Sequence, residues 1–467
     1  MKAADTAAYY ADHPRARTTA LAIIAIGSLL NPLMLSSVNV AVPDIGHELQ
    51  ADAVMLSWIP TAFMLASAAC LLPFGKLADM YGRKLIYLGG MVLLTVGALA
   101  AAVAPTMEVL LAARVVQGVS SAMVFGTGTA ILAGIFPARR LGSALGIYAS
   151  AVYIGLTGGP WYGGLVTEAL GWRMVFMLQV PVSLLVVVVT ALVLRGEWKM
   201  EPRPRFDWQG ALIFGAWASA LVIGLSWLPS WRGAALSAGS VLLLTWFVRD
   251  QIGKEHPLVR LRALRANHVF SYSMLAAFFM YGANFPIVFL LSLYLQYIGG
   301  LNPGQAGALL IVQALMMAVM APLAGRLADR FEARVLTTVG CIVVAGGFLW
   351  LTQLGHGSAQ WVVVVGQLLV GTGFGFFSTP NTTAAMSAVK SGNLGVASAL
   401  VNLARTIGNL IGMGIVMLIF ALTIGRTQIL PEEYDSLLFT VRCALALSAV
   451  YAMVGAYFCW SRGRTRQ

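Results

Sequence analysis

Runs of about twenty apolar residues recur along almost the whole chain, and each is long enough to cross a bilayer as a helix. Inside a bilayer the backbone must satisfy its own hydrogen bonds, which leaves helices or closed barrels. The runs are continuous rather than alternating, so helices are favoured. Only 10% of the residues are charged, against roughly a quarter in soluble domains. The sequence therefore predicts an all-α membrane protein of about fourteen transmembrane helices.

The charges are distributed unevenly between the loops. The net charge is +12, yet the basic residues gather in every second loop. Examples are Lys84, Arg139, Arg195, Arg262 and Arg330, whereas the alternate loops hold Asp44, Glu48, Glu108, Glu432 and Glu433. An excess of Lys and Arg marks the cytoplasmic loops of membrane proteins. We therefore expect a multi-pass protein of the cell inner (cytoplasmic) membrane with both termini in the cytoplasm, and no nucleic-acid partner.

A short internal repeat divides the chain into halves. Gly75-Lys-Leu-Ala-Asp79 and Gly325-Arg-Leu-Ala-Asp329 each follow an apolar run and precede a basic loop. Matched segments half a chain apart are typical of transporters built from parallel repeats, and chance similarity of two short loops is the alternative. If each half has six core spans, the spans near 208–247 are an insertion between the halves.

The first copy of the repeat belongs to a longer pattern, G-x-L-x-D-x-x-G-R-K, between the predicted spans 53–74 and 85–104. Its residues are Gly75, Asp79, Gly82, Arg83 and Lys84. Glycines allow a tight turn, and Asp79 can accept charge-assisted hydrogen bonds from helix amides or from an arginine of the other half. Such a contact, made in one state and broken in the other, would be a conformational latch, with Gly325 and Asp329 as its counterpart. Topogenic charge alone explains Arg83 and Lys84, but not the acidic residue.

This pattern resembles the signature of the major facilitator superfamily, and the resemblance covers nearly the whole chain. Arg114, Gln117 and Gly118 resemble its R-x-x-Q-G element. A glycine–proline motif resembles the G-x-x-x-G-P-x-x-G-G pattern of the family's antiporters; it comprises Gly155, Gly159, Pro160, Gly163 and Gly164. Shorter elements resemble the fourteen-span drug:proton antiporter branch; they are Trp172-Arg173, Phe206-Asp207 with Gly210, and Gly395–Gly412.

The resemblance implies the major facilitator fold, with two six-helix bundles around a central cavity and two extra helices between them. The implied divisions are a cytoplasmic tail (1–17), an N-terminal six-helix bundle (18–195), a linker with two additional helices (196–267), a C-terminal six-helix bundle (268–460) and a second cytoplasmic tail (461–467). It also implies a small-molecule substrate and protons as the coupling ion. We expect the protein to act as a monomer in the lipid bilayer.

The glycine–proline motif suits a helix that moves. Small residues at every fourth position let two helices pack backbone to backbone, and Pro160 removes one ladder hydrogen bond and permits a bend. A hinge is therefore expected in this span, and simple close packing is the alternative.

Polar residues inside the apolar runs are candidates for a cavity. Arg114 is costly in a span, so we expect it to face a cavity or a partner, with Gln117 beside it in the motif; snorkelling is the alternative. Arg405 lies near mid-membrane and is either a second cavity residue or a structural donor between helices. Further candidates are Asn31, Asn284 and Gln313, with Phe278, Phe279, Tyr281 and Phe285 as an aromatic wall.

The first span lacks an acidic residue that this branch usually carries before its N-V-A-x-P element. That element is present as Asn39–Pro43, but Met34 occupies the acidic position. All 18 Asp and Glu residues fall in predicted loops or at span ends. A buried carboxylate is the obvious proton carrier and counter-charge for cations. Its absence favours neutral or anionic substrates, with Asp79 or Asp44 as remaining proton carriers.

We interpret the chain as a secondary transporter that exports small amphipathic molecules, with proton antiport implied by the resemblance. The alternatives are a carrier of neutral or anionic metabolites or lipid-like compounds, and a membrane sensor that does not transport. An enzyme is not expected, because the five histidines lie in separate segments. No metal site or cofactor is expected either, since the four cysteines lack metal or redox spacing.

Overall fold

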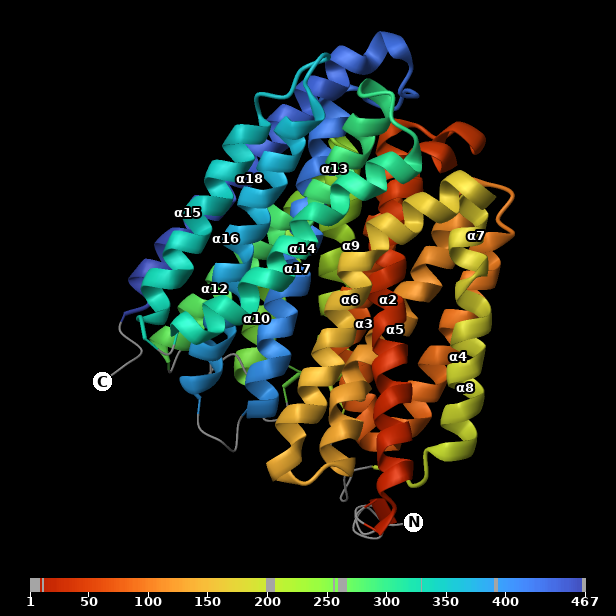
Figure 1. Ribbon diagram of the computed structural model, residues 1–467, viewed down its shortest axis with the longest axis vertical. Helices are drawn as coiled ribbons and strands as arrows, with labels where there is room; N and C mark the ends of the chain where they lie inside the picture. Colours follow the sequence, from red (N-terminus) through yellow and green to blue (C-terminus); the bar gives the residue numbers. More distant parts are fainter. Residues whose placement is uncertain are drawn as a thin grey trace.

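The computed structural model describes residues 9–10, 12–198, 206–254, 257–258, 267–328, 330–389 and 394–463. Within these residues, thirteen helices are long and apolar enough to cross a membrane. A further long helix, α6 (Ala138–Leu170), lies among them (Figure 1). The described part of the chain contains helices and connecting segments but no strand. The prediction of an all-α membrane protein is confirmed.

The helices form two groups that stand side by side (Figure 1). The first group contains α2 (Pro14–Glu48), α3 (Ala53–Tyr81), α4 (Arg83–Ala102), α5 (Met107–Ile135), α6, α7 (Trp172–Met177) and α8 (Gln179–Val193). The second group contains α12 (His268–Asn284), α13 (Pro286–Leu293), the π-helical turn η1 (Tyr294–Ile298), α14 (Pro303–Ala328), α15 (Ala333–Leu351), α16 (Gln360–Ser387), α17 (Leu394–Thr423), the 3₁₀ turn η3 (Pro431–Glu433) and α18 (Tyr434–Ser461).

Helices α9 (Trp208–Ser226) and α10 (Trp231–Gly253) form a hairpin that packs where the two groups meet. One hydrophobic cluster joins Phe63 of α3, Phe214 of α9 and Leu410 of α17. The hairpin therefore contacts one helix of each group along their shared edge.

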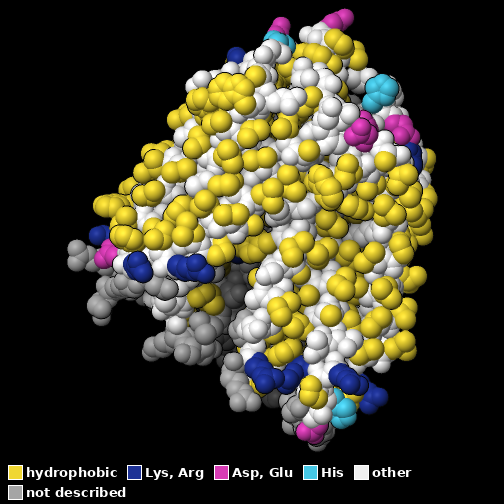
Figure 2. Space-filling view, viewed as in Figure 1, with side chains coloured by type: hydrophobic (Ala, Val, Ile, Leu, Met, Phe, Trp, Pro, Cys, Tyr) yellow, Lys and Arg dark blue, Asp and Glu magenta, His cyan; other side chains and the backbone are white. Residues whose placement is uncertain are grey.

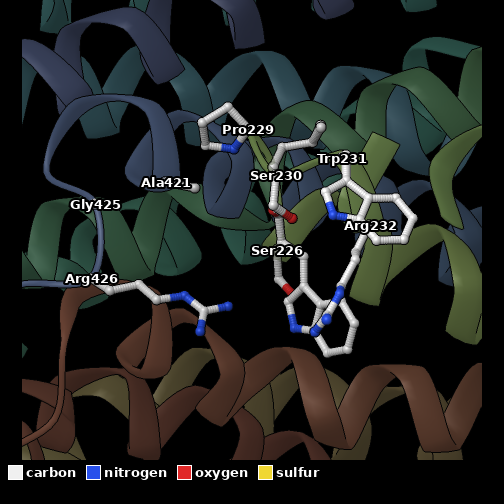
Figure 3. A pocket seen from close by; sticks show the side chains of 10 residues that line it. Ser226, Pro229, Ser230, Trp231, Arg232, Ala421, Gly425 and Arg426 are labelled. Carbon is white, nitrogen blue, oxygen red and sulfur yellow. The ribbon is translucent and has the colours of Figure 1, made fainter. Parts of the chain in front are cut away.

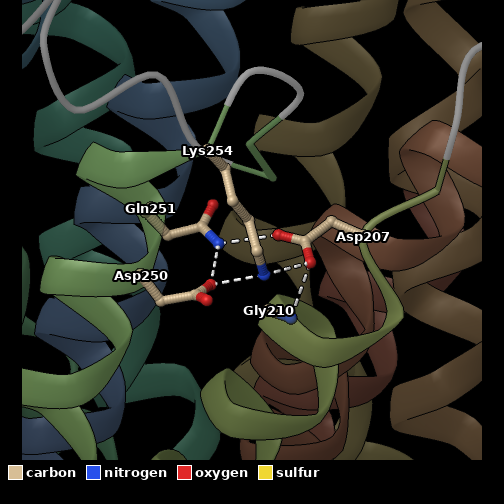
Figure 4. A network of polar contacts seen from close by, with 5 residues as sticks. All are labelled: Asp207, Gly210, Asp250, Gln251 and Lys254. Carbon is tan, nitrogen blue, oxygen red and sulfur yellow. Dashed lines mark hydrogen bonds and ion pairs between the residues drawn. The ribbon is translucent and has the colours of Figure 1, made fainter.

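A buried polar network closes the open end of this hairpin (Figure 4). The Asp207 carboxylate caps α9 by accepting from the Gly210 amide at 2.9 Å, and it also accepts from Gln251 Nε2 and Lys254 Nζ, each at 2.7 Å. Lys254 bonds Asp250 as well, at 2.5 Å. Burial raises the pKa of the Asp207 carboxyl, but the bonds from Lys254, Gln251 and Gly210 outweigh it and hold this pKa below its usual value. The Asp207 and Gly210 noted in the sequence are thus a helix cap and its partner.

The two ends of the molecule carry opposite charge. In Figure 2 the Lys and Arg side chains gather at the lower end and the Asp and Glu side chains mainly at the upper end. We call these the basic end, which includes Arg83 and Lys84, and the acidic end, which includes Glu48 and Glu432. The start of α2 and the end of α18 both lie at the basic end (Figure 1). This arrangement agrees with an even number of membrane crossings.

The two groups of helices meet at the acidic end and separate toward the basic end. At the acidic end, Gln296 Nε2 donates to the Val40 carbonyl at 2.9 Å, and the Ala53 amide donates to the Thr427 carbonyl at 3.0 Å. Toward the basic end the ribbons diverge, and the surface is hollowed between them (Figures 1 and 2). A Cβ built on Gly75, near the basic end of α3, would meet nothing within 4 Å.

Some helix boundaries differ from those predicted. The span predicted at 53–74 continues as α3 to Tyr81, so Gly75–Asp79 is helical and not a loop. The spans predicted near 208–247 are the helices α9 and α10, and α10 continues to Gly253. Apolar residues mark the part of a helix inside the bilayer, whereas the backbone ladder continues until something ends it. Helix α3 ends at Gly82, whose backbone φ of +129° lies in the region that favours glycine.

Candidate functional site

Arg114 is fully buried between α5 and α3, with 0% of its surface exposed. Its Nε donates to the Ile59 carbonyl at 3.1 Å, its Nη1 donates to Gln117 Oε1 at 2.6 Å, and the guanidinium lies 4.7 Å from the centroid of the Phe63 ring. Its Nη2 has no partner among the described residues. The described contacts of Arg114 are thus with a carbonyl, a side-chain amide and an aromatic ring.

Arg405 of α17 has a matching environment in the second group. Its Nη2 donates to Thr382 Oγ1 of α16 at 2.5 Å, and its guanidinium lies 4.9 Å from the centroid of the Tyr281 ring of α12. Its Nε has no described partner. Unlike Arg114, Arg405 is only half-buried. Each group thus holds, within a long apolar helix, an arginine that lies over an aromatic ring and forms none of the ion pairs found among the described residues.

The other polar candidates divide into a pair and an isolated residue. Gln313 Nε2 of α14 donates to Asn284 Oδ1 at the end of α12 at 2.6 Å, so the structure brings these two candidates together. Asn31 of α2 is buried, and neither its Nδ2 nor its Oδ1 has a described partner. Among the described residues, five of the polar candidates carry unpartnered hydrogen-bonding atoms: Asn31, Arg114, Gln117, Gln313 and Arg405.

The predicted aromatic wall is only partly assembled. Tyr281 packs edge-on against Phe374 of α16, at 5.1 Å between ring centroids, and lies under Arg405. Phe279 instead contacts Tyr451 and Phe458 of α18. Because Phe279 packs inside the second group, Tyr281 is the better placed of the two to contact a ligand beside Arg405.

The glycine–proline motif places α6 against both groups of helices. A Cβ on Gly163 would lie 2.4 Å from the Ser37 carbonyl oxygen of α2, and Gly155 and Gly159 make similar approaches to that helix. A Cβ on Gly164 would lie 2.3 Å from the Pro303 carbonyl oxygen of α14, in the other group. The motif is thus a two-sided contact near the acidic end. Glu168, one turn further on, accepts hydrogen bonds from Asn302 Nδ2 at 2.9 Å and the Gly304 amide at 3.1 Å.

Pro160 leaves the Leu156 carbonyl without its helical donor, because proline has no N–H. Ser36 of α2 supplies the replacement: its Oγ donates to the Leu156 carbonyl at 2.9 Å. The freed backbone group of α6 is therefore bonded by a neighbouring helix of the same group.

The repeated loop motif makes its observed bonds inside the first group. Arg83 bonds Asp79 Oδ1 through Nε at 3.0 Å and Nη2 at 2.9 Å, and its Nη1 donates to the Ala130 carbonyl of α5 at 3.0 Å. Lys84 Nζ bonds the Leu194 carbonyl. In the second copy, Gly325 lies in α14, whereas Asp329 lies outside the described residues. In this conformation, the bonds of Asp79 to described residues are those to Arg83, and none of them reaches the second group.

A family model for the "Major Facilitator Superfamily" matches residues 24–413. The chain belongs to the major facilitator superfamily. Multidrug resistance protein Stp of Mycobacterium tuberculosis is 32% identical over 424 residues, covering 88% of this chain and 78% of Stp. Riboflavin transporter RibZ of Clostridioides difficile is 26% identical over 408 residues, covering 87% and 89%.

A solved structure shares the fold of this major facilitator protein. It is a bacterial homologue of the human lysosomal transporter Spinster, in an inward-facing and unoccupied conformation, with a TM-score of 0.68, 16% identity, and coverage of 96% of this chain and 97% of the other. The expected fold is confirmed. The chain is a membrane transporter of small molecules, and the prediction that it is not an enzyme is also confirmed.

Two charged residues of this transporter were missed by the sequence analysis. Arg462 was assigned to a tail, yet it is fully buried and donates to Asn381 Oδ1 and Thr337 Oγ1, each at 2.9 Å. Glu197 accepts from the Lys84 amide at 2.8 Å, and a Cβ on Gly82 would lie 2.3 Å from its carboxyl carbon. An acidic residue among basic loops was a signal for Glu197, as it was for Asp79. Arg462 carried no such signal.

Proposed function

We propose that this transporter exports small amphipathic molecules across the cytoplasmic membrane by alternating access, with proton antiport. The observation that carries the proposal is the two-sided contact of α6. Gly163 meets α2 of its own group and Gly164 meets α14 of the other group, near the end where the groups are joined. Close backbone contact between helices of two groups can be released and remade without breaking charged pairs.

The positive-inside bias gives the direction in which the cavity opens. The basic end is assigned to the cytoplasm, so the separation at this end makes the conformation inward-facing. We propose that residues 18–195 and 268–460 tilt against each other as two bodies, with residues 196–267 following them. The Asp79–Arg83 pair would exchange its bonds when the basic end closes and so act as the latch. We propose that the protein acts as a monomer.

Proton coupling and membership of the fourteen-span drug:proton antiporter branch rest on the motifs and on the relatives. Two of the relatives are a multidrug resistance protein and a cephamycin export protein. Asp79 and Asp44 are the proposed proton carriers, since Met34 of α2 is buried where the branch usually has an acidic residue.

A second candidate function is export of neutral or anionic compounds without proton coupling through the first span. Its support is the pair of arginines: Arg114 Nη2 and Arg405 Nε lack described partners, and each guanidinium lies on an aromatic ring. An unpaired arginine in a low-dielectric cavity favours anions and hydrogen-bond acceptors and opposes cations. Tyr281 beside Arg405 would contact the apolar part of an amphipathic molecule.

Transport in proteoliposomes tests the proposal and separates the two candidates. Purified protein is assayed with matched cationic, neutral and anionic amphiphiles, with and without an imposed proton gradient, in wild type and in Arg405→Gln. Gradient-dependent movement of any class supports proton antiport. Gradient-independent movement of neutral or anionic compounds, lost in Arg405→Gln, supports the second candidate. Absence of movement for all three classes under every gradient would contradict export of amphipathic molecules.

A further inference from the structure

Two adjoining hollows lie at the acidic end, where the α9–α10 connection meets α17, α3 and α5. The first has a volume of about 780 Å³ and is lined by the connection and by the segment after α17. The second has a volume of about 400 Å³ and lies against α3 and α5. Trp227 and Arg426 line both hollows, so the two adjoin at these residues, and we call them together the groove.

The first hollow is cationic. Arg232 and Arg426 extend into it from opposite sides, the first from the start of α10 and the second from the segment after α17 (Figure 3). None of the ion pairs of the described residues includes either arginine. Ser226 and Ser230 add hydroxyl oxygens to the same wall. Two guanidinium groups that take part in none of these ion pairs are suited to a phosphate or carboxylate group.

The second hollow is apolar. Val54, Met55 and Trp58 of α3 line it together with Leu111 and Val115 of α5. Its one acidic lining residue, Asp52, uses a carboxylate oxygen to cap α3, accepting from the Met55 amide at 2.7 Å. An aliphatic chain is therefore the better match to this arm of the groove.

Two tryptophans of the groove are exposed. Trp227 and Trp231 are 42% and 76% exposed at the acidic end of the hairpin. Tryptophan is enriched at the boundary between hydrocarbon and water, where its ring is in lipid and its N–H near the headgroups. The cationic hollow and the apolar arm are thus placed for the head and the chain of one amphiphile.

We propose that this groove binds an anionic amphiphile, with its phosphate or carboxylate between Arg232 and Arg426 and its chain against α3 and α5. An anionic phospholipid of the outer leaflet and a free anionic amphiphile share this chemistry. The site is separate from Arg114 and Arg405, so it does not depend on the identity of the cargo.

The groove lies beside a contact that joins the two groups of helices, so a bound amphiphile would act on the conformation of the transporter. Arg426 precedes Thr427, whose carbonyl accepts the Ala53 amide of α3 at 3.0 Å and so joins the two groups of helices. A ligand that contacts Arg426 and α3 together binds the closed acidic end better than the open one. By linkage, it favours the inward-facing conformation.

Native mass spectrometry of the full-length protein tests the site. Detergent-solubilised protein is titrated with dioleoyl phosphatidylglycerol, and bound lipid is counted for wild type, Arg232→Gln, Arg426→Gln and Arg249→Gln. The control Arg249 is exposed at the other end of α10 and loses the same charge. We expect roughly tenfold weaker binding of the first lipid in both site variants and no change in the control. Equal binding in all four proteins would overturn the proposal.

Three further probes distinguish the sources of the ligand. Dioleoyl phosphatidylcholine has the same chains without net charge, inorganic phosphate has charge without a chain, and dodecyl phosphate is a free anionic amphiphile. Competition by dodecyl phosphate, with no competition by the other two, supports an amphiphile site open to soluble ligands. Retention of phosphatidylglycerol against dodecyl phosphate supports a phospholipid site. Equal competition by phosphatidylcholine or by inorganic phosphate would contradict the proposal, because head and chain are both required.

Discussion

The acidic and basic ends of this transporter are constructed differently. At the acidic end, the contacts between the two groups are mostly close backbone approaches and neutral hydrogen bonds, such as Gly164 against Pro303 and Gln296 to Val40. At the basic end, Arg83 bonds Asp79 within one group, and Gly75 faces open space. The closed end therefore depends on shape, and the open end holds charged groups that are already paired. A transporter that opens and closes needs surfaces that pack closely at the closed end. At the open end, its charged groups need hydrogen-bonding partners within their own group of helices.

The largest expected effect is on the shape of the closed end. Gly164→Val places a side chain where a Cβ would lie 2.3 Å from the Pro303 carbonyl oxygen. Overpacking costs about 1–3 kcal/mol, which shifts the balance between closed and open by roughly 5- to 150-fold. We expect transport, measured as the initial rate in proteoliposomes, to fall by at least about fivefold.

Gly158→Val is the matched control on the same helix, because a Cβ on Gly158 meets nothing within 4 Å. Equal rates for Gly164→Val and the wild type would show that close approach at the acidic end is not required.

The second expected effect concerns the arginine nearer the closed end. Arg114 lies seven residues after Met107, which begins α5 at the acidic end, or about 10 Å along the helix. Arg114→Ala should lower the initial rate of transport by about fivefold, while the thermal unfolding temperature stays within a few degrees of wild type. Arg114→Lys retains the charge but loses the planar fork, so we expect it to remain impaired. Wild-type transport in Arg114→Ala would remove this residue from the site.

A smaller effect is expected at the basic end. Asp79→Asn removes the charge that holds Arg83, so we expect conformational exchange to slow by a few-fold, which corresponds to about 1 kcal/mol. Substrate affinity, measured by equilibrium binding, should be unchanged. Asp435→Asn is the control, since Asp435 is 92% exposed at the acidic end. Unchanged turnover in Asp79→Asn would contradict the latch.

The smallest effect is expected where α6 is supported by α2. Ser36→Ala removes the donor to the Leu156 carbonyl that Pro160 leaves unpaired, at a cost of about 1 kcal/mol in the free energy of unfolding. Ser57→Ala is the control, because the Ser57 hydroxyl donates to a carbonyl of its own helix. A thermal shift no larger in Ser36→Ala than in Ser57→Ala would indicate that the freed carbonyl needs no support.

Much of the fold could be predicted from the sequence because apolar length alone decides where helices cross a bilayer. The extent of α3 past Gly75 could not, since a helix continues into water until a residue such as Gly82 ends it. Arg462 was assigned to a tail because nothing in the local sequence shows that Asn381 and Thr337 lie beside it.

Within the candidate site, residue types were predictable and partners were not. Polar residues in apolar runs identified Arg114, Asn284 and Gln313, but only the structure shows that Gln313 of α14 bonds Asn284 at the end of α12. The observed conformation was also beyond sequence reasoning. Two states of a transporter differ by only a few kcal/mol, and one sequence must be compatible with both.

The central claim is that the two ends open and close in alternation, and paired spin-label distances test it most directly. In a cysteine-free background, one pair of labels replaces Gln50 and Gln428, whose side chains bond at 2.8 Å across the acidic end. A second pair replaces Arg140 and Phe331, beside the basic ends of α6 and α14. We predict a short acidic and a long basic distance at rest, and a population with the reverse pattern during transport. Distances that stay fixed during turnover, or lengthen together at both ends, would contradict the account.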